Sequence, residues 1–322
     1  MDPSALRVTF MGSAAFAVPS LSALFAAGYH LVQVVTRADK PRGRGLDLAR
    51  TPIAERATAL GLPLFQPRTL RTPEVLEALR EAAPDLIVVA AYGRILPPEV
   101  LALPRHGCVN VHGSILPKYR GAAPVQWALI RGESETGVTL MQMDEGLDTG
   151  PVLAVRATPV AEEDTAATVT DRLAELGAEL LVASLPGILD GVVLPVAQDD
   201  AGSTLAPPLE KGDGAIDWTA PSRTVRDRVR GVEPWPGAFT TTPGGLRLRV
   251  FPPVVREIGG GFDGVPGQVL GADRDGMVVR TGDGAVRVLE LQPAGSRRMD
   301  ARDAVAGRRV RVGDVLGVER PS

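Results

Sequence analysis

The first 190 residues alternate between short apolar runs and longer amphipathic stretches. The apolar runs, which predict buried strands, cover Leu6 to Met11, Leu31 to Val35, Leu86 to Ala91, Gly107 to His112 and Val138 to Met143. The stretches that predict helices cover Ala17 to Ala27, Ile53 to Leu60, Pro73 to Ala83, Pro124 to Arg131 and Ala166 to Leu189. This alternation predicts an α/β fold with a doubly wound, Rossmann-like sheet, in which ligands bind outside the carboxyl ends of the strands.

The pattern changes after residue 191. Residues 192–212 are rich in proline, and we expect a semi-rigid linker between domains. A helix is expected at Pro221 to Arg230, and short strands are expected at Leu246 to Val250, Gly267 to Leu270, Met277 to Thr281, Ala285 to Leu291 and Val310 to Val318. Gly282-Asp283-Gly284 is a hairpin signal. The expected domains are therefore residues 1–191 and a small OB-like β-barrel at residues 213–322.

The amino-acid composition disfavours several classes of protein but does not indicate a function. A hydrophobic fraction of 44% with 23% charged residues is ordinary for a globular protein. No apolar run approaches the roughly 18 residues of a membrane span, and the first residues do not resemble a secretion signal. Cys108 is the single cysteine, which excludes an internal disulfide and is expected to pack as a small apolar residue. We therefore expect a cytoplasmic protein, active as a monomer.

The net charge of −3 is spread unevenly. Residues 213–322 carry 17 Arg, no Lys and 14 acidic residues, whereas residues 1–212 carry 18 basic and 24 acidic residues. Positive charge carried by arginine favours a phosphate-bearing partner for the second domain. A general preference for Arg explains the residue type, since only three Lys occur in the chain, but it explains the difference in sign less well.

Two polar residues at a strand end are the strongest candidates for chemistry. Asn110 and His112 are two positions apart in an alternating run, so they project from the same face of the predicted strand. An amide can donate to a developing oxyanion while an imidazole moves a proton, a combination that suits reactions at a carbonyl. Taken alone, an Asn-x-His pair is more often hydrogen-bonded scaffolding.

A second strand-end loop supplies acidic residues. Asp148 follows 36 positions after His112 and could hold the imidazole in place. Asp144 and Glu145 are rival acids, and spacing alone does not choose among the three. Asp148 could instead be an Asx-turn residue that satisfies its own backbone. A metal site built from His112 and these acids is disfavoured, because the other two histidines fall at poor positions to complete it.

Two further loops bear on ligands. Gly12 to Ala17 lies where Rossmann domains bind pyrophosphate, but it lacks two of the three glycines, which disfavours a dinucleotide. Arg37 to Gly45 is a basic loop with glycine and proline, and its arginines suit either phosphate contacts or plain solvation.

Together these segments resemble the formyltransferases that use 10-formyltetrahydrofolate. The motifs that carry the resemblance are Asn110-x-His112, Gly113 to Pro117, Tyr119 to Pro124, Gly146 to Gly150, Phe10 to Gly12, Ala91 to Gly93, Pro234 to Pro236 and Leu291 to Gly295. The basic loop and the second domain point to the branch that acts on initiator tRNA charged with methionine. The sequence departs from the family pattern at Ser13-Ala14-Ala15 and at Leu46-Asp47.

The resemblance implies a role for each residue. Asn110 would donate to the formyl oxygen, His112 would shuttle the proton, and Asp148 would position His112. The expected co-substrate residues, which would bind 10-formyltetrahydrofolate, are Tyr92, Gly93, Ser114, Ile115, Leu116 and Pro117. The expected tRNA contacts are Arg42 and Arg44, and no metal is implied.

Other functions fit part of the pattern. A formyltransferase acting on a small amine, such as glycinamide ribonucleotide or an amino sugar nucleotide, would need neither the basic loop nor the arginine-bearing domain. A formyltetrahydrofolate hydrolase would release formate without tRNA. An RNA-binding protein on an α/β scaffold would have no use for an oxyanion donor beside a proton shuttle.

Overall fold

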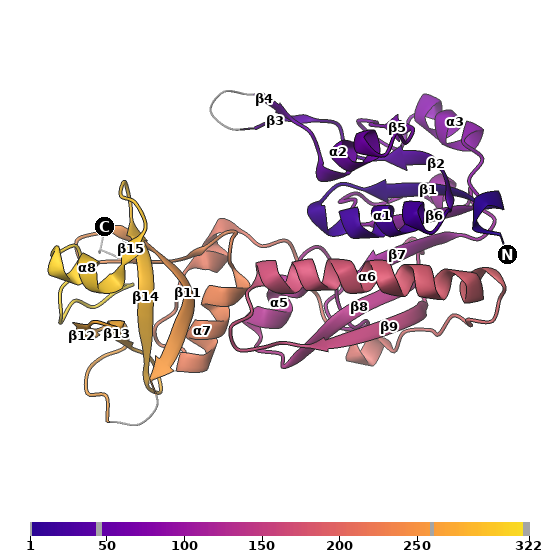
Figure 1. Cartoon of the computed structure of the whole chain (residues 1–322). Helices are drawn as coiled ribbons and strands as arrows, with labels where there is room; N and C mark the ends of the chain where they lie inside the picture. Colours follow the sequence, from indigo (N-terminus) through magenta and orange to yellow (C-terminus); the bar gives the residue numbers. More distant parts are fainter. Residues whose placement is uncertain (1, 43–46, 258–260, 318–322) are drawn as a thin grey trace. The chain divides into compact units, whose positions relative to one another are not determined.

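The computed structural model describes residues 2–42, 47–257 and 261–317 (Figure 1). The chain divides into two compact units. The first unit comprises Met1–Pro124, Thr136–Thr158 and Thr170–Pro207, and the second comprises Val125–Glu135, Pro159–Val169 and Pro208–Ser322. Among the described residues, no helix has both the length and the apolar character needed to span a bilayer.

A seven-stranded sheet forms the centre of the first unit. In spatial order its strands are β5 (Leu64–Phe65), β2 (His30–Val35), β1 (Arg7–Gly12), β6 (Leu86–Ala90), β7 (Cys108–His112), β8 (Glu135–Gln142) and β9 (Val152–Pro159). The pairs from β5 to β7 are parallel, and β8 runs antiparallel to β7. A separate antiparallel pair consists of β3 (Lys40–Arg42) and β4 (Asp47–Ala49).

Helices cover both faces of this sheet because its central strands are apolar on both sides. On β6, Leu86 and Val88 join one buried cluster, whereas Ile87 and Val89 join another. The helices of the first cluster are α1 (Val18–Ala26), α2 (Pro52–Ala59) and α6 (Ala166–Leu189). Those of the second are α3 (Pro73–Glu81) and α4 (Pro98–Leu101). The predicted doubly wound α/β fold is confirmed.

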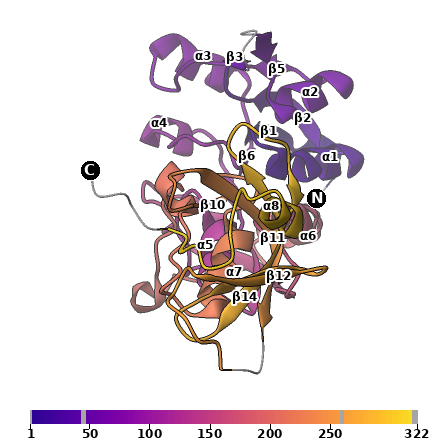
Figure 2. The ribbon, with the colours of Figure 1, turned by 90° about the vertical axis from the view of Figure 1, so that its left-hand side faces the viewer.

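The second unit is built on an antiparallel sheet (Figure 2). Its spatial order is β10 (Ala238–Thr241), β11 (Arg247–Glu257), β14 (Ala285–Pro293), β13 (Gly276–Arg280) and β12 (Val269–Asp273), and β15 (Met299–Asp300) pairs with β14. Three helices belong to this unit wholly or almost wholly: α5 (Pro124–Ile130), α7 (Ser222–Gly231) and α8 (Ala301–Ala306). The hairpin at Gly282-Asp283-Gly284 joins β13 to β14 as predicted, and the sheet is consistent with the expected OB-like domain.

The strand predicted at Val310 to Val318 is wrong over its described residues, 310–317. A turn interrupts this run, in which the Asp314 carboxylate accepts from the Arg311 amide at 2.8 Å and Gly313 has a φ of +92°. Only Val315 forms an isolated bridge, with Gln268. The apolar residues therefore pack without forming a ladder.

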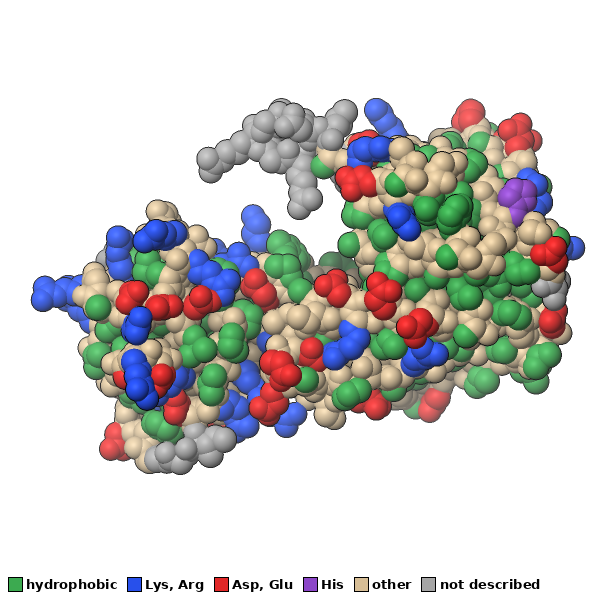
Figure 3. Space-filling view, viewed as in Figure 1, with side chains coloured by type: hydrophobic (Ala, Val, Ile, Leu, Met, Phe, Trp, Pro, Cys, Tyr) green, Lys and Arg blue, Asp and Glu red, His purple; other side chains and the backbone are tan. Residues whose placement is uncertain are grey.

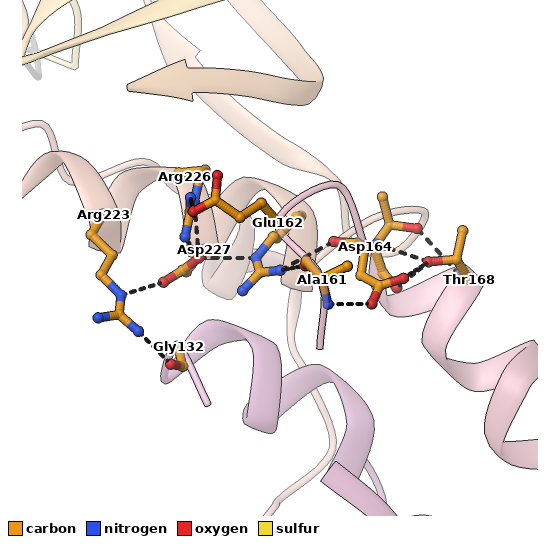
Figure 4. A network of polar contacts seen from close by, with 10 residues as sticks. Gly132, Ala161, Glu162, Asp164, Thr168, Arg223, Arg226 and Asp227 are labelled. Carbon is orange, nitrogen blue, oxygen red and sulfur yellow. Dashed lines mark hydrogen bonds and ion pairs between the residues drawn. The ribbon is translucent and has the colours of Figure 1, made fainter. Parts of the chain in front are cut away.

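Within the second unit, α7 is fixed by a buried carboxylate (Figure 4). Asp227 is 2% exposed and lies 2.9 Å from Arg230 Nε, 3.1 Å from Arg226 Nη2 and 3.6 Å from Arg223 Nε. Two of these arginines also donate to carbonyls of earlier segments. Arg230 reaches Ala161 O at 2.7 Å, and Arg223 reaches Gly132 O at 2.8 Å. The Asp227 carboxylate therefore orients the side chains that join three stretches of chain.

We expect Asp227→Asn to lower the free energy of unfolding by roughly 3–5 kcal/mol, because the change removes the charge that compensates buried arginines. Glu162→Gln is the matched control, since Glu162 pairs with Arg226 at 3.2 Å but its side chain is 87% exposed. That control should cost less than about 1 kcal/mol. Urea unfolding measures both variants, and equal stability of the two would contradict the central role of Asp227.

Candidate active site at the end of strand β7

Strand β7 places Asn110 and His112 side by side in the first unit. Both are nearly buried, with exposed fractions of 9% and 6%. The intervening Val111 and the preceding Val109 belong to the apolar cluster on the other side of the strand. The alternation of the strand therefore separates two polar side chains from the core, as the sequence predicts.

The carboxylate of Asp148 lies against both residues. Its Oδ2 atom is 3.7 Å from His112 Nδ1, and its Oδ1 atom accepts from Asn110 Nδ2 at 3.5 Å. The Gly121 amide also donates to Oδ2, at 2.9 Å. The three residues singled out from the sequence thus converge on one point, and the amide of Gly121 joins them.

The two rival acids are engaged elsewhere or face solvent. Asp144 accepts from the Gly146 amide at 3.0 Å and from the Thr149 hydroxyl at 2.8 Å, so it fastens its own loop. Glu145 is exposed. Asp148 is the acid whose carboxylate lies against Asn110 and His112. The structure therefore separates the three acids, which sequence spacing did not.

His112 is held from both sides. Its Nε2 atom lies 3.0 Å from the carbonyl oxygen of Tyr119, opposite the Asp148 contact at Nδ1. A neutral ring can donate to only one of these oxygens, whereas an imidazolium can donate to both. Tyr119 has a φ of +62°, a left-handed conformation in which its amide donates to the Thr204 hydroxyl at 2.9 Å. The ring is thus held in place by an oxygen atom on each side.

A distant segment runs beside the loop that follows β7. The Arg120 amide donates to Thr204 O at 2.8 Å, and the Ala206 amide donates to Arg120 O at 2.7 Å. Gly121 lies at the closest approach, where an added Cβ would stand 2.7 Å from Ala206 O and φ is +124°. Only glycine fits here. Thr204 and Ala206 lie within residues 192–212, which the sequence analysis interpreted as a linker. No motif in that stretch indicated a role at the site.

The predicted co-substrate residues after β7 form a tightly bonded loop. Ser114 is fully buried and its hydroxyl donates to Lys118 O at 2.6 Å. The Thr139 hydroxyl donates to Ser114 O at 2.7 Å and accepts from the Leu116 amide at 3.1 Å. Ile115 and Pro117 are partly exposed, unlike Ser114 and Leu116. Ser114 and Leu116 therefore shape the loop, and Ile115 and Pro117 present surface.

Tyr92 and Gly93 lie in the loop that follows β6, on the same sheet edge. The Tyr92 side chain is 1% exposed, and burial raises the pKa of its hydroxyl against the opposing charges of Arg94 and Arg37. Gly93 has a φ of +75° and lies against the Arg37 guanidinium. Tyr92 is therefore a packed, uncharged side chain that supports the turn.

The departure at Ser13 has a structural role. The Ser13 hydroxyl, which is buried, donates to Tyr92 O at 3.2 Å and accepts from the Arg37 amide at 3.3 Å. It thereby joins the loops that follow β1, β2 and β6. The sequence showed the residue but not this link.

Three further expectations from the sequence concern the tRNA-contacting arginines, Cys108 and a metal site. Arg44 lies outside the described residues, as does the side chain of Arg42, whose backbone belongs to β3. Burial raises the pKa of the Cys108 thiol to about 12, so this residue does not supply a nucleophilic thiolate at neutral pH. Among the described side chains, no three His, Cys, Asp or Glu residues are grouped to hold a metal ion.

Comparisons with known proteins agree with this architecture. Residues 6–185 match the formyl transferase family model, and residues 208–309 match the model of the formyl transferase C-terminal domain. The chain is 50% identical to a methionyl-tRNA formyltransferase of Myxococcus xanthus, over 95% of this chain and 96% of that one. It is 46% identical to another from Caldanaerobacter subterraneus, over 97% of this chain and 100% of that one.

Among solved structures, the sugar 3N-formyl transferase WlaRD, crystallised in the presence of dTDP and 5-N-formyl-THF, shares the fold. It superposes with a TM-score of 0.67 at 16% identity, covering 91% of this chain and 99% of that one. The identity to relatives along nearly the full length is decisive. The chain belongs to the formyl transferase family and, within it, to the methionyl-tRNA formyltransferases.

Proposed function

We propose that the protein transfers the formyl group of 10-formyltetrahydrofolate to the α-amino group of methionyl initiator tRNA. The convergence of Asn110 and His112 on the Asp148 carboxylate carries this proposal. Its three residues supply an oxyanion donor, a proton carrier and an acid that orients the carrier, which acyl transfer to an amine requires. The relatives named for this activity support the choice of substrate.

Each residue has a defined task in the proposed reaction. Asn110 donates an amide N–H to the formyl oxygen as negative charge develops there, and its long contact with Asp148 leaves this donor weakly engaged. The α-amino group attacks the formyl carbon, and His112 takes up the proton that the amine loses. The bond between the formyl carbon and N10 then breaks, and tetrahydrofolate leaves with this proton on N10. Asp148 keeps the ring oriented through its contact with Nδ1.

Two surfaces are assigned to the co-substrate and the tRNA. We assign the folate contacts to Ile115 and Pro117, with the backbone of the Tyr92 and Gly93 loop. Their partial exposure supports this assignment, and Ser114 and Leu116 would shape that surface from within the loop. The structure of WlaRD, crystallised in the presence of 5-N-formyl-THF, supports a folate site in this fold.

We assign the tRNA contacts to Arg42, Arg44 and arginines of residues 213–322. In this proposal residues 1–191 form the catalytic domain, and residues 192–212 link it to the domain of residues 213–322. On the face in Figure 3, basic side chains of the second unit are interspersed with acidic ones. Such a mixed surface favours several separate phosphate contacts over one uniform basic face. We propose that the enzyme acts as a cytoplasmic monomer.

The decisive experiment supplies purified protein with 10-formyltetrahydrofolate and initiator tRNA charged with labelled methionine. Formyl-methionine recovered after mild deacylation is the expected result. Formate release without tRNA would indicate a hydrolase instead, and transfer only to a small amine such as glycinamide ribonucleotide would replace the tRNA as substrate. Charged elongator tRNA serves as the specificity control.

Asn110→Ala should lower kcat by roughly 10²–10³, because it removes a donor to the developing oxyanion. The KM values for both substrates should change far less, since the donor acts mainly in the transition state. Steady-state formylation measures both parameters, with circular dichroism to confirm folding. A folded variant with near-normal kcat would eliminate the oxyanion role.

Asp148→Asn should lower kcat and alter its pH profile, because it removes the negative charge that lies 3.7 Å from His112 Nδ1. Asp144→Asn is the matched control, since Asp144 belongs to the same loop but bonds only to Gly146 and Thr149 among the contacts described. Formylation rates between pH 6 and about 9 distinguish them. Identical profiles for the two variants would refute the role of Asp148.

A further inference from the structure

Gln198, in the chain that follows helix α6, contacts the backbone of the Asp148 loop. Its Nε2 atom donates to Asp148 O at 2.9 Å and to Gly150 O at 2.7 Å. Its Oε1 atom accepts from Arg120 Nε at 3.0 Å and from Arg120 Nη2 at 2.8 Å. Both ends of one amide are thus fully engaged between two loops of the active site.

Asp148 needs such support because its backbone is strained. Its φ of +52° is a left-handed conformation that a residue with a Cβ rarely adopts, at a cost of about 1 kcal/mol or more. The Gly121 amide restrains the carboxylate, whereas Gln198 restrains the carbonyl of the same residue. Together they restrain the backbone and the side chain of the same residue.

Arg120 determines which way the amide of Gln198 points. Its side chain is 8% exposed, and its two N–H groups converge on Oε1, which leaves the NH₂ group facing the two carbonyls. A glutamate at position 198 would still pair with Arg120. It would, however, place a carboxylate oxygen against the Asp148 and Gly150 carbonyl oxygens. Two hydrogen bonds to the loop would then be replaced by repulsion between oxygen atoms.

We propose that Gln198 is a positioning residue for Asp148, and through it for His112. The inference rests on the proposed function, in which Asp148 is a catalytic carboxylate. Gln198, which would align it, lies outside both matched family regions. The segment after α6 therefore contributes to the catalytic geometry of the first unit as well as connecting the chain.

Gln198→Glu should lower kcat by about tenfold to a hundredfold, since a misplaced catalytic group costs that much, with both KM values within about threefold of wild type. Asp200→Asn is the matched control. Asp200 also pairs with Arg120 at 2.8 Å, but its side chain is 84% exposed. This control should retain wild-type kcat, and Gln198→Met provides a neutral variant of similar length that should resemble Gln198→Glu.

A double-variant cycle separates positioning from general stability. If Gln198 acts through Asp148, adding Gln198→Glu to Asp148→Asn should lower kcat by less than about twofold further, because coupled residues are not additive. Full additivity, or a wild-type kcat in both Gln198 variants, would overturn the inference. Should Gln198→Glu not fold, the same cycle with Gln198→Met decides. Wild-type protein inactive on methionyl-tRNA would instead refute the proposed function.

Discussion

The active site depends on the close approach of two backbone segments far apart in sequence. Residues 119–123, after β7, and residues 204–206, after α6, exchange backbone hydrogen bonds, and Ala206 O leaves no space for a side chain at position 121. This approach fixes the Tyr119 carbonyl that contacts His112 and the Gly121 amide that contacts Asp148. The side chains of the candidate site are buried or half-buried, and main-chain groups contact two of them, His112 and Asp148.

Main-chain support of this kind has a physical advantage. Backbone amides and carbonyls held in a ladder have little conformational freedom left to lose, so they restrain a side chain more firmly than a long polar side chain would. Ser13 adds support through a short side chain, because its buried hydroxyl links the loops that follow β1, β2 and β6. The edge of the sheet is therefore rigid where chemistry is expected.

The parts of the structure that follow from local periodicity could be predicted from the sequence. β6 is buried on both faces and reads as a continuous apolar run. In β7 the polar Asn110 and His112 alternate with apolar residues, and this period of two placed them on one face. β9 escaped prediction because it is mostly half-buried or exposed and lacks such a run. Spacing alone could not choose Asp148 over Asp144, and only the family resemblance indicated it, since the choice depends on how one loop folds against residues 121 and 198.

The buried Asp227 cluster has a consequence for how the chain is divided. Through Arg223 and Arg230 it fastens α7 to residues 132 and 161, which lie inside the first matched family region although they pack with the second unit. The boundary drawn by sequence families and the boundary drawn by packing are therefore different. A carboxyl-terminal region exchanged between relatives would need compatible residues in the segments around positions 132 and 161. The two matched family regions are therefore constrained to evolve together.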